Sequence, residues 1–248
     1  MPCDGYNGLL PSGINSNETQ AAPLDPDLLP ILGEALAVEL ANTLYQHRGE
    51  TTMDFLATSE HVALWFAHAP PAASLGLPKR LTSSQVADIR ALRNAVHHIL
   101  DRWTRDTSEA SGAPVATLNR YASRTACRLH LDWPDGGTPR AALVPSGPAF
   151  DALLARLACD CIGFLAGPQL PLLRRCDGPD CAMFFVQHHH KRRFCQEGCS
   201  HRARQARYYH ATAPGKRTDA PARPAAMTAM TARTPRTPRT ARTARTQP

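Results

Sequence analysis

The chain has 248 residues, of which 43% are hydrophobic, and its formal net charge is +7. This size fits one domain with a substantial core plus appendages. No stretch approaches the roughly 18 uninterrupted apolar residues of a membrane-spanning helix, and the first residues lack the basic and apolar runs of a secretory signal. The sequence therefore predicts a cytoplasmic protein, in which thiols stay reduced and paired cysteines more often bind metal than form disulfides.

The positive charge is concentrated in the C-terminal third. Residues 211–248 contain eight Lys or Arg against one acid, and residues 172–210 contain eight against three, whereas residues 1–171 are net acidic. One interpretation is a polyanionic partner for the C-terminal third. The alternative is a basic segment that is only solvated, which is common in proteins.

In chain order, residues 1–28 mix Pro, Asn, Gly and Ser without periodicity and predict a loose leader. A helical domain is expected over 29–171. Apolar residues at helical spacing predict a first helix within 31–46 and a second within 54–69, where PPAAS ends the pattern.

The strongest helical pattern spans 83–103, and Thr82 with Gln85 predicts a capping box at its start. The alternating run CRLHL at 127–131, the turn sequence PDGGTP and the short apolar run at 140–144 predict a two-stranded hairpin. A further helix is expected up to Leu165, because Gly and Pro follow it. The predicted fold class is mainly α with a small β-hairpin.

The segment CDGPDCAMFFVQHHHKRRFCQEGCSHR, residues 176–202, contains two close cysteine pairs. The spacing Cys176-x4-Cys181-x13-Cys195-x3-Cys199 is typical of a tetrahedral zinc site with four thiolate ligands. A turn at Gly-Pro brings the first two thiolates together, and a first helical turn places the second two on one side. The sequence predicts one structural Zn²⁺.

Other interpretations of this segment are a disulfide pair, a redox dithiol and a site with histidine ligands. A reducing compartment disfavours a disulfide, and the redox motif C-x-x-C is absent. His188, His189 and His190 lie where a loop is expected. A catalytic zinc keeps an open position and uses His or carboxylate ligands, so four cysteines favour a structural ion.

The stretch RRCDGPDCAMFF…KRRFCQEGCSHRARQARYY resembles the CGNR-type zinc finger, and the stretches ALAVELANTL, DFL…LWF and IRALRNAVHHIL resemble the ABATE domain that precedes it. The resemblance covers roughly residues 29–210. It implies a treble-clef-like finger over 172–210 and a transcriptional regulator of a stress response that binds nucleic acid. At the position that names the family the chain reads Cys199-Ser200-His201-Arg202, so Gly and Asn are replaced and contacts that depend on them are in doubt.

Basic residues around the finger are candidates for nucleic-acid binding, because arginine binds phosphates bidentately and reads guanine edges. They are Arg192, Arg193, Arg202, Arg204 and Arg207. The expected partner is double-stranded DNA, with RNA as the alternative. A solvated face that only balances the thiolate charge is the other interpretation of this cluster.

The helical domain offers four polar residues on otherwise apolar helices, namely Glu39, Asn42, Arg90 and Arg93. They could line a pocket for a small-molecule ligand, or they could be surface residues at the edge of the apolar stripe. The pair His97-His98 is expected on a solvated face. No catalytic motif occurs, so the chain is not expected to be an enzyme. The main alternative function is a protein-interaction adaptor with a ligand-sensing domain.

Residues 211–248 are rich in Arg, Thr, Pro and Ala. Such a sequence cannot bury enough apolar surface to offset its chain entropy, so a disordered tail is expected. Its evenly spaced arginines could hold phosphates weakly.

Overall fold

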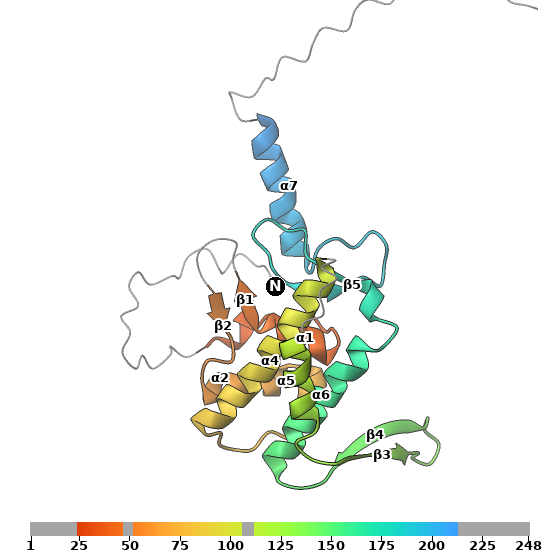
Figure 1. The fold of residues 1–248 in the computed structure, drawn as a ribbon. Coiled ribbons are helices and arrows are strands. Elements are labelled where there is room, and N and C mark those ends of the chain that lie inside the picture. The colour runs from red at the N-terminus through yellow and green to blue at the C-terminus, as the bar shows by residue number, and fades with distance from the viewer. Residues whose placement is uncertain (1–23, 47–51, 106–111, 213–248) are drawn as a thin grey trace, which may run out of the picture. The chain divides into compact units, whose positions relative to one another are not determined.

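A computed structural model of the chain describes residues 24–46, 52–105 and 112–212 (Figure 1). The predicted leader lies mostly outside these residues, and so does the predicted tail. The described residues up to Ala211 belong to one compact unit. None of the helices in the described ranges is long and apolar enough to cross a membrane.

Helices make up most of the described fold. They are α1 (Leu36–Asn42), α2 (Ser59–His68), α3 (Pro70–Ala73), α4 (Ser83–Thr104), α5 (Gly112–Ala122), α6 (Ala149–Leu165) and α7 (Glu197–Thr212), with short 3₁₀ turns at Pro26–Leu28 and Leu170–Leu172. The expected fold class is confirmed, and α4 begins with the predicted capping box, in which Thr82 and Gln85 bond to each other's backbone amides.

Within the described residues the strands form three antiparallel pairs rather than the single hairpin predicted. They are β1 (Leu44–Gln46) with β2 (Thr52–Asp54), β3 (Cys127–Asp132) with β4 (Arg140–Pro145), and β5 (Leu173–Arg175) with β6 (Phe184–Val186). The predicted hairpin is β3–β4, joined by the PDGGTP turn.

Two parts of the helical domain differ from the sequence expectation. The first helix ends at Asn42, because the Thr43 hydroxyl donates to the Leu40 carbonyl and the next residues pair as β1. Helix α5 was not predicted, since Leu118 and Tyr121 are its only buried residues and leave no apolar stripe. The Tyr121 hydroxyl donates to Asp88 of α4, which attaches α5 through a tertiary contact.

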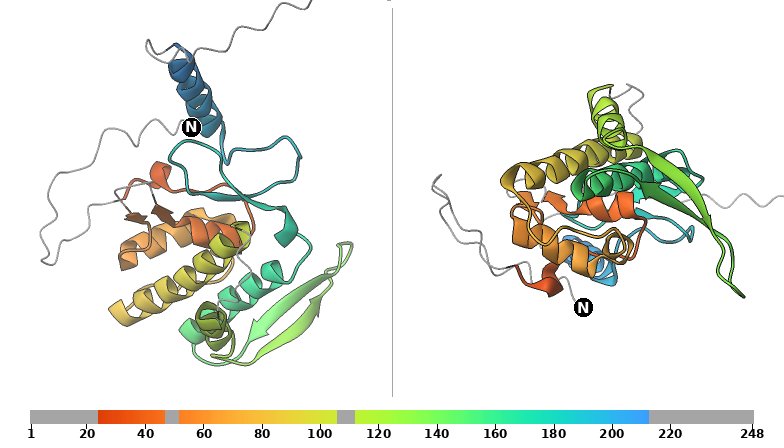
Figure 2. Two further views of the ribbon diagram at one scale, coloured as in Figure 1. Left: turned by 45° about the horizontal axis from the view of Figure 1, so that its top comes forward. Right: turned by 90° about the horizontal axis from the view of Figure 1, so that it is seen from below.

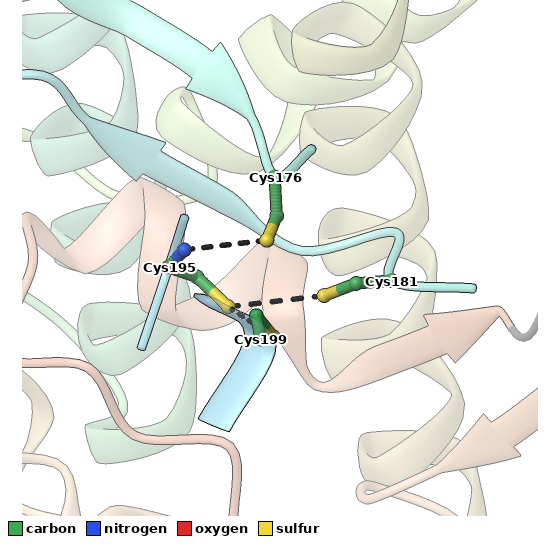
Figure 3. A group of neighbouring side chains, drawn as sticks. All are labelled: Cys176, Cys181, Cys195 and Cys199. Carbon is green, nitrogen blue, oxygen red and sulfur yellow. Dashed lines mark hydrogen bonds between the residues drawn. The ribbon is translucent and has the colours of Figure 1, made fainter. Parts of the chain in front are cut away.

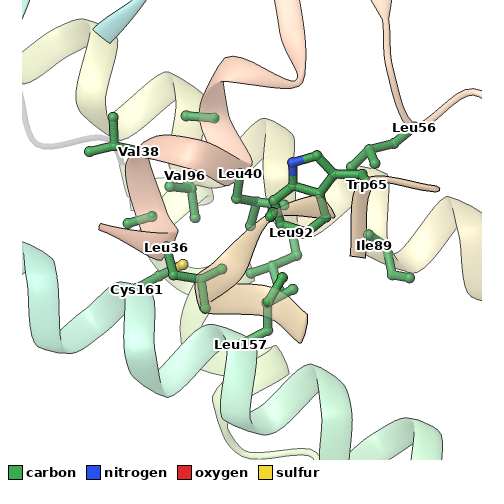
Figure 4. Packing of buried hydrophobic residues seen from close by; sticks show 14 of the residues in the cluster. Leu36, Val38, Leu40, Leu56, Trp65, Ile89, Leu92, Val96, Leu157 and Cys161 are labelled. Carbon is green, nitrogen blue, oxygen red and sulfur yellow. The ribbon is translucent and has the colours of Figure 1, made fainter. Parts of the chain in front are cut away.

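The core is centred on α1, which is buried along its whole length. Leu36, Val38 and Leu40 pack there among side chains of α4 and α6, and Trp65 of α2 belongs to the same cluster (Figure 4). Five of its seven residues are apolar, and such a helix is expected to be enclosed in this way.

The cysteine-containing segment shares this core. Leu173, Phe184 and Val186 of the β5–β6 hairpin belong to the same buried cluster as the helices. The sequence boundary near residue 171 is therefore not a boundary between two cores. The helical domain instead positions the hairpin that holds the first two cysteines.

Candidate metal centre and basic helix

Four buried cysteines converge where β5, β6 and α7 meet (Figure 3). Cys176 follows β5, Cys181 ends the next turn, Cys195 precedes α7 and Cys199 lies in its first turn. The four sulfur atoms lie within 4.8 Å of one another. Cys195 Sγ is 3.7 Å from Cys181 Sγ and 3.5 Å from Cys199 Sγ.

Glycine and backbone amides shape this cluster. The N–H groups of Gly178 and Cys195 each donate to Cys176 Sγ over 3.3 Å, which favours a thiolate at that sulfur. A Cβ at Gly178 would lie 2.9 Å from Cys199 Cβ and 3.3 Å from both the Cys176 and the Cys199 sulfurs. Any side chain there would therefore push α7 away from the first cysteine pair.

The cluster fits a tetrahedral zinc ion. With Zn–S bonds of about 2.3 Å, the sulfurs of a regular tetrahedron lie about 3.8 Å apart, close to the separations measured here. All four donors are thiolates, and no position is left for a substrate. Cys176, Cys181, Cys195 and Cys199 thus hold one structural Zn²⁺, as predicted, in a treble-clef-like arrangement of hairpin and helix. Bound there, the ion would join the start of α7 to the hairpin.

The electrostatics of the cluster favour a bound cation. The pKa of Cys176 is lowered by hydrogen bonds from the other three thiols and from the Cys195 amide, whereas hydrogen bonds with the other three sulfurs, together with burial, raise the pKa of Cys195. Four sulfurs this close cannot all ionise alone, and a divalent cation allows it. Arg202 donates to Cys199 Sγ over 3.2 Å and offsets part of the remaining negative charge.

Histidines and other cysteines do not join the centre. His188, His189 and His190 are exposed in the loop after β6, and the rings of His189 and His190 stack at 4.6 Å. This is the loop position predicted for them. Cys161 is fully buried in the helical core, and Cys3 lies outside the described residues.

Arg192, predicted to contact nucleic acid, is used inside the protein. Its guanidinium donates to Glu34 at 2.8 Å and to the carbonyl of Cys195 at 3.0 Å, and it lies 4.6 Å from the centre of the Phe185 ring. These contacts fix the metal loop against the helical domain, and contact of the half-buried side chain with nucleic acid stays a prediction. Arg193 is 68% exposed and pairs with Asp177.

Helix α7 carries the other predicted basic residues. Arg204 and Arg207 are exposed, while Arg202 is half-buried beside its cysteine. Tyr208 and Tyr209 are 66% and 70% exposed. Residues three and four apart share a helix face, so Arg204, Arg207 and Tyr208 form one exposed surface, named here the basic face of α7.

Glu39 and Asn42, predicted as ligand-binding residues, hold the backbone of neighbouring segments. Glu39 accepts hydrogen bonds from the backbone amides of Leu32 and Glu34. Asn42 donates to the Phe184 carbonyl at 3.0 Å and accepts from the Phe184 amide at 2.9 Å, as an extra strand would. Both side chains are buried and fully engaged in these contacts.

Arg90 and Arg93 of α4 both bind Asp54 of β2. Arg93 is 1% exposed and binds both Asp54 oxygens, at 2.9 and 2.8 Å, while Arg90 pairs with the same carboxylate. Burial alone would raise the pKa of Asp54, but the hydrogen bonds and charge of Arg93 outweigh it and lower the pKa. Glu39, Asn42 and the arginines thus serve separate structural contacts and do not form the predicted binding pocket. An open cleft of about 510 Å³ lies elsewhere, lined by residues that include Leu36, Asp160 and Phe164.

Three further residues join the metal centre to the helical domain. Tyr45 of β1 donates to the Asp180 carbonyl in the first cysteine turn. Glu34 accepts from the Val186 amide as well as from Arg192. His97 is buried against the edge of the Phe184 ring, and burial followed by the nearby charge of Arg175 lowers its pKa to about 4. The expectation of a solvated His97 is thus wrong. No local sequence pattern indicates these three contacts.

Two family models match the chain. Residues 34–168 match ABATE, described as a putative stress-induced transcription regulator, and residues 173–211 match the CGNR zinc finger. The resemblance inferred from the sequence is therefore confirmed. A search of curated proteins found no match.

Proposed function

We propose, from the premise that the chain belongs to the ABATE family, that it regulates transcription by binding double-stranded DNA through α7. The observation that carries the proposal is the basic face of α7, which is exposed beside a structural metal centre that fixes the start of the helix. At 1.5 Å per residue, the 16 residues of α7 span about 24 Å, and such a helix fits the major groove of B-DNA.

The exposed arginines near the metal centre are the candidates for contact with DNA. Arg204 and Arg207 are exposed on α7, and Arg193 is exposed on the loop before it. Tyr208 and Tyr209 can pack on the sugar-phosphate backbone. Arg202 would contribute indirectly. It donates a hydrogen bond to Cys199 Sγ and so helps to position the start of α7. The proposal gives the chain a binding role and no reaction.

The test is fluorescence anisotropy with labelled duplex DNA and the full zinc-loaded chain at increasing salt. Replacing Arg204 and Arg207 by Ala should weaken binding at all salt concentrations. It should also reduce the slope of log affinity against log salt by about two, because two phosphate contacts are lost. Arg80→Ala serves as the control, because Arg80 is also exposed and lies on the loop before α4.

The basic segment 213–248 requires its own control, since its charge alone binds DNA weakly. A synthetic peptide of that segment gives the non-specific baseline. If the full chain binds no more tightly than this peptide, the DNA proposal fails. Salt-insensitive capture of one protein without retention of DNA would favour the adaptor function instead.

A further inference from the structure

The β3–β4 hairpin exposes apolar side chains in a row. Leu129, Leu131 and Trp133 are 75%, 61% and 67% exposed, and alternate residues of a strand point to the same face. The hairpin extends away from the helices in each view (Figure 2). Exposed apolar residues grouped in this way mark interaction surfaces in soluble proteins.

The outer edge of β3 is also open to pairing. Ser146 donates to the Ala126 carbonyl, so hydrogen-bonded pairs of this antiparallel ladder fall on the even-numbered residues of β3. Pro145, which has no N–H, accordingly lies opposite Cys127 at a non-hydrogen-bonded pair. The N–H and C=O groups of Leu129 and Leu131 therefore point away from β4. Among the described strands β3 pairs with β4 alone.

This edge has only part of the usual protection against pairing. Natural edge strands are short, bulged or covered, or they carry proline or charged residues, lysine above all. Strand β3 has six residues, five of them exposed, and contains neither proline nor lysine; its charged residues, Arg128 and Asp132, have opposite signs.

The sequence of β3 is complementary to itself in one antiparallel register. With a two-fold axis at His130, Leu129 lies opposite Leu131 of a second copy, and their outward backbone groups can exchange hydrogen bonds. The same register places Arg128 opposite Asp132 of the second copy, and each pair occurs twice. With the axis at Leu129, Arg128 would lie opposite His130 of the second copy, and with the axis at Leu131, Asp132 would, so neither register pairs the two charges.

We propose that two copies of this chain associate by antiparallel pairing of β3 with β3 about a two-fold axis at His130, which forms a sheet of four strands. The three exposed apolar side chains offer roughly 400 Å² per copy. A stable complex buries about 800 Å² per partner, so the dimer forms and dissociates with protein concentration. The proposal does not depend on DNA binding.

The test is sedimentation velocity on the full zinc-loaded chain from about 1 μM to about 1 mM. A reducing buffer prevents disulfide formation at Cys127. The parent chain should change from monomer to dimer within this range. Arg128→Asp should raise the dissociation constant about tenfold, because both cross-strand pairs become like-charged. Arg80→Asp, a matched reversal on a distant exposed loop, should leave it unchanged.

Charge exchange identifies the partner strand. Asp132→Arg should also weaken the dimer. The double variant Arg128→Asp/Asp132→Arg should restore it, because in the proposed register position 128 of one copy lies opposite position 132 of the other, and opposite charges then face each other again. Circular dichroism and zinc content verify that each variant is folded. A chain that stays monomeric throughout the range, a dimer unaffected by Arg128→Asp, or a double variant that is not restored would each overturn the proposal.

Discussion

Glu39 is a carboxyl group without exposed surface in the central helix of the core. Burial, with a smaller contribution from the charge of Glu34, raises its pKa to about 7, although backbone amides donate to its oxygens. Burial thus outweighs the hydrogen bonds. The Glu39 side chain positions the segment before α1 through these hydrogen bonds. Its ionised form, however, lowers the free energy of unfolding, because a buried charge is unfavourable.

We expect Glu39→Gln to raise the free energy of unfolding relative to the parent at neutral pH. Between the unfolded pKa near 4.5 and the folded pKa of about 7, the folded parent binds more protons than the unfolded chain. The parent therefore loses up to about 1.4 kcal/mol of stability per pH unit as pH rises through this window. Gln keeps an acceptor oxygen for both amides and has no such proton.

Urea unfolding across this pH range measures the effect. The difference between variant and parent should grow from about pH 4.5 to about pH 7 and then level off. Glu60→Gln provides the control, because Glu60 is exposed and hydrogen bonds, first from its own backbone amide, lower its pKa. A Glu39→Gln difference that is independent of pH would contradict this role.

At the scale of elements, α1 and the β5–β6 hairpin form one packed unit. Asn42 supplies both a donor and an acceptor to Phe184 of β6, and Glu34, which precedes α1, accepts from Val186. Three buried backbone groups of β6 thus obtain their partners from a segment more than 140 residues earlier. Elements joined in this way are expected to unfold together.

We expect Asn42→Ala to lower the free energy of unfolding by roughly 3 kcal/mol, because the amide and carbonyl of Phe184 both lose their buried partner. Asn119→Ala on α5 makes the same chemical change at an exposed position and should shift stability by less than about 0.5 kcal/mol. Urea unfolding of the two variants and the parent measures these losses in the free energy of unfolding. Equal losses would mean that the contact with Phe184 contributes little.

At the scale of the whole molecule, the metal centre and the helices pack against each other through residues of one hairpin. Phe184 and Val186 lie in the helical core, while Met183 and Phe185 of the same segment pack with the four cysteines. Arg192 and Tyr45 add polar contacts between the two clusters. The zinc finger is therefore a part of the fold and not an appended module.

We expect zinc removal to destabilise the helices together with the finger. Calorimetry should show one unfolding transition, which moves to lower temperature when zinc is removed by a chelator or by Cys199→Ser. Cys159→Ser, a cysteine outside the cluster, should keep both the zinc, measured by elemental analysis, and the transition. A separate transition of the finger, with the helical transition unmoved, would contradict this coupling.

Much of this protein could be predicted from local sequence. The cysteine spacing gave the zinc ligands because a knuckle and a helical first turn involve only a few consecutive residues. The capping box of α4 and the PDGGTP hairpin could be predicted for the same reason. The apolar pattern around Leu44 is compatible with either a helix or a strand. Residues 44–46 form a strand because they pair with β2.

By itself, then, the sequence determined the metal site, the helical class and the basic character of α7. Only the tertiary structure decided which polar residues face solvent. Arg192 and Arg204 look alike in sequence, yet the first is bound to Glu34, 158 residues earlier, and the second is exposed. Glu39, Asn42 and Arg93 resemble ligand-binding residues until their partners are known. The physical reason is that a buried polar side chain is satisfied by residues distant in sequence, and no local pattern records that pairing.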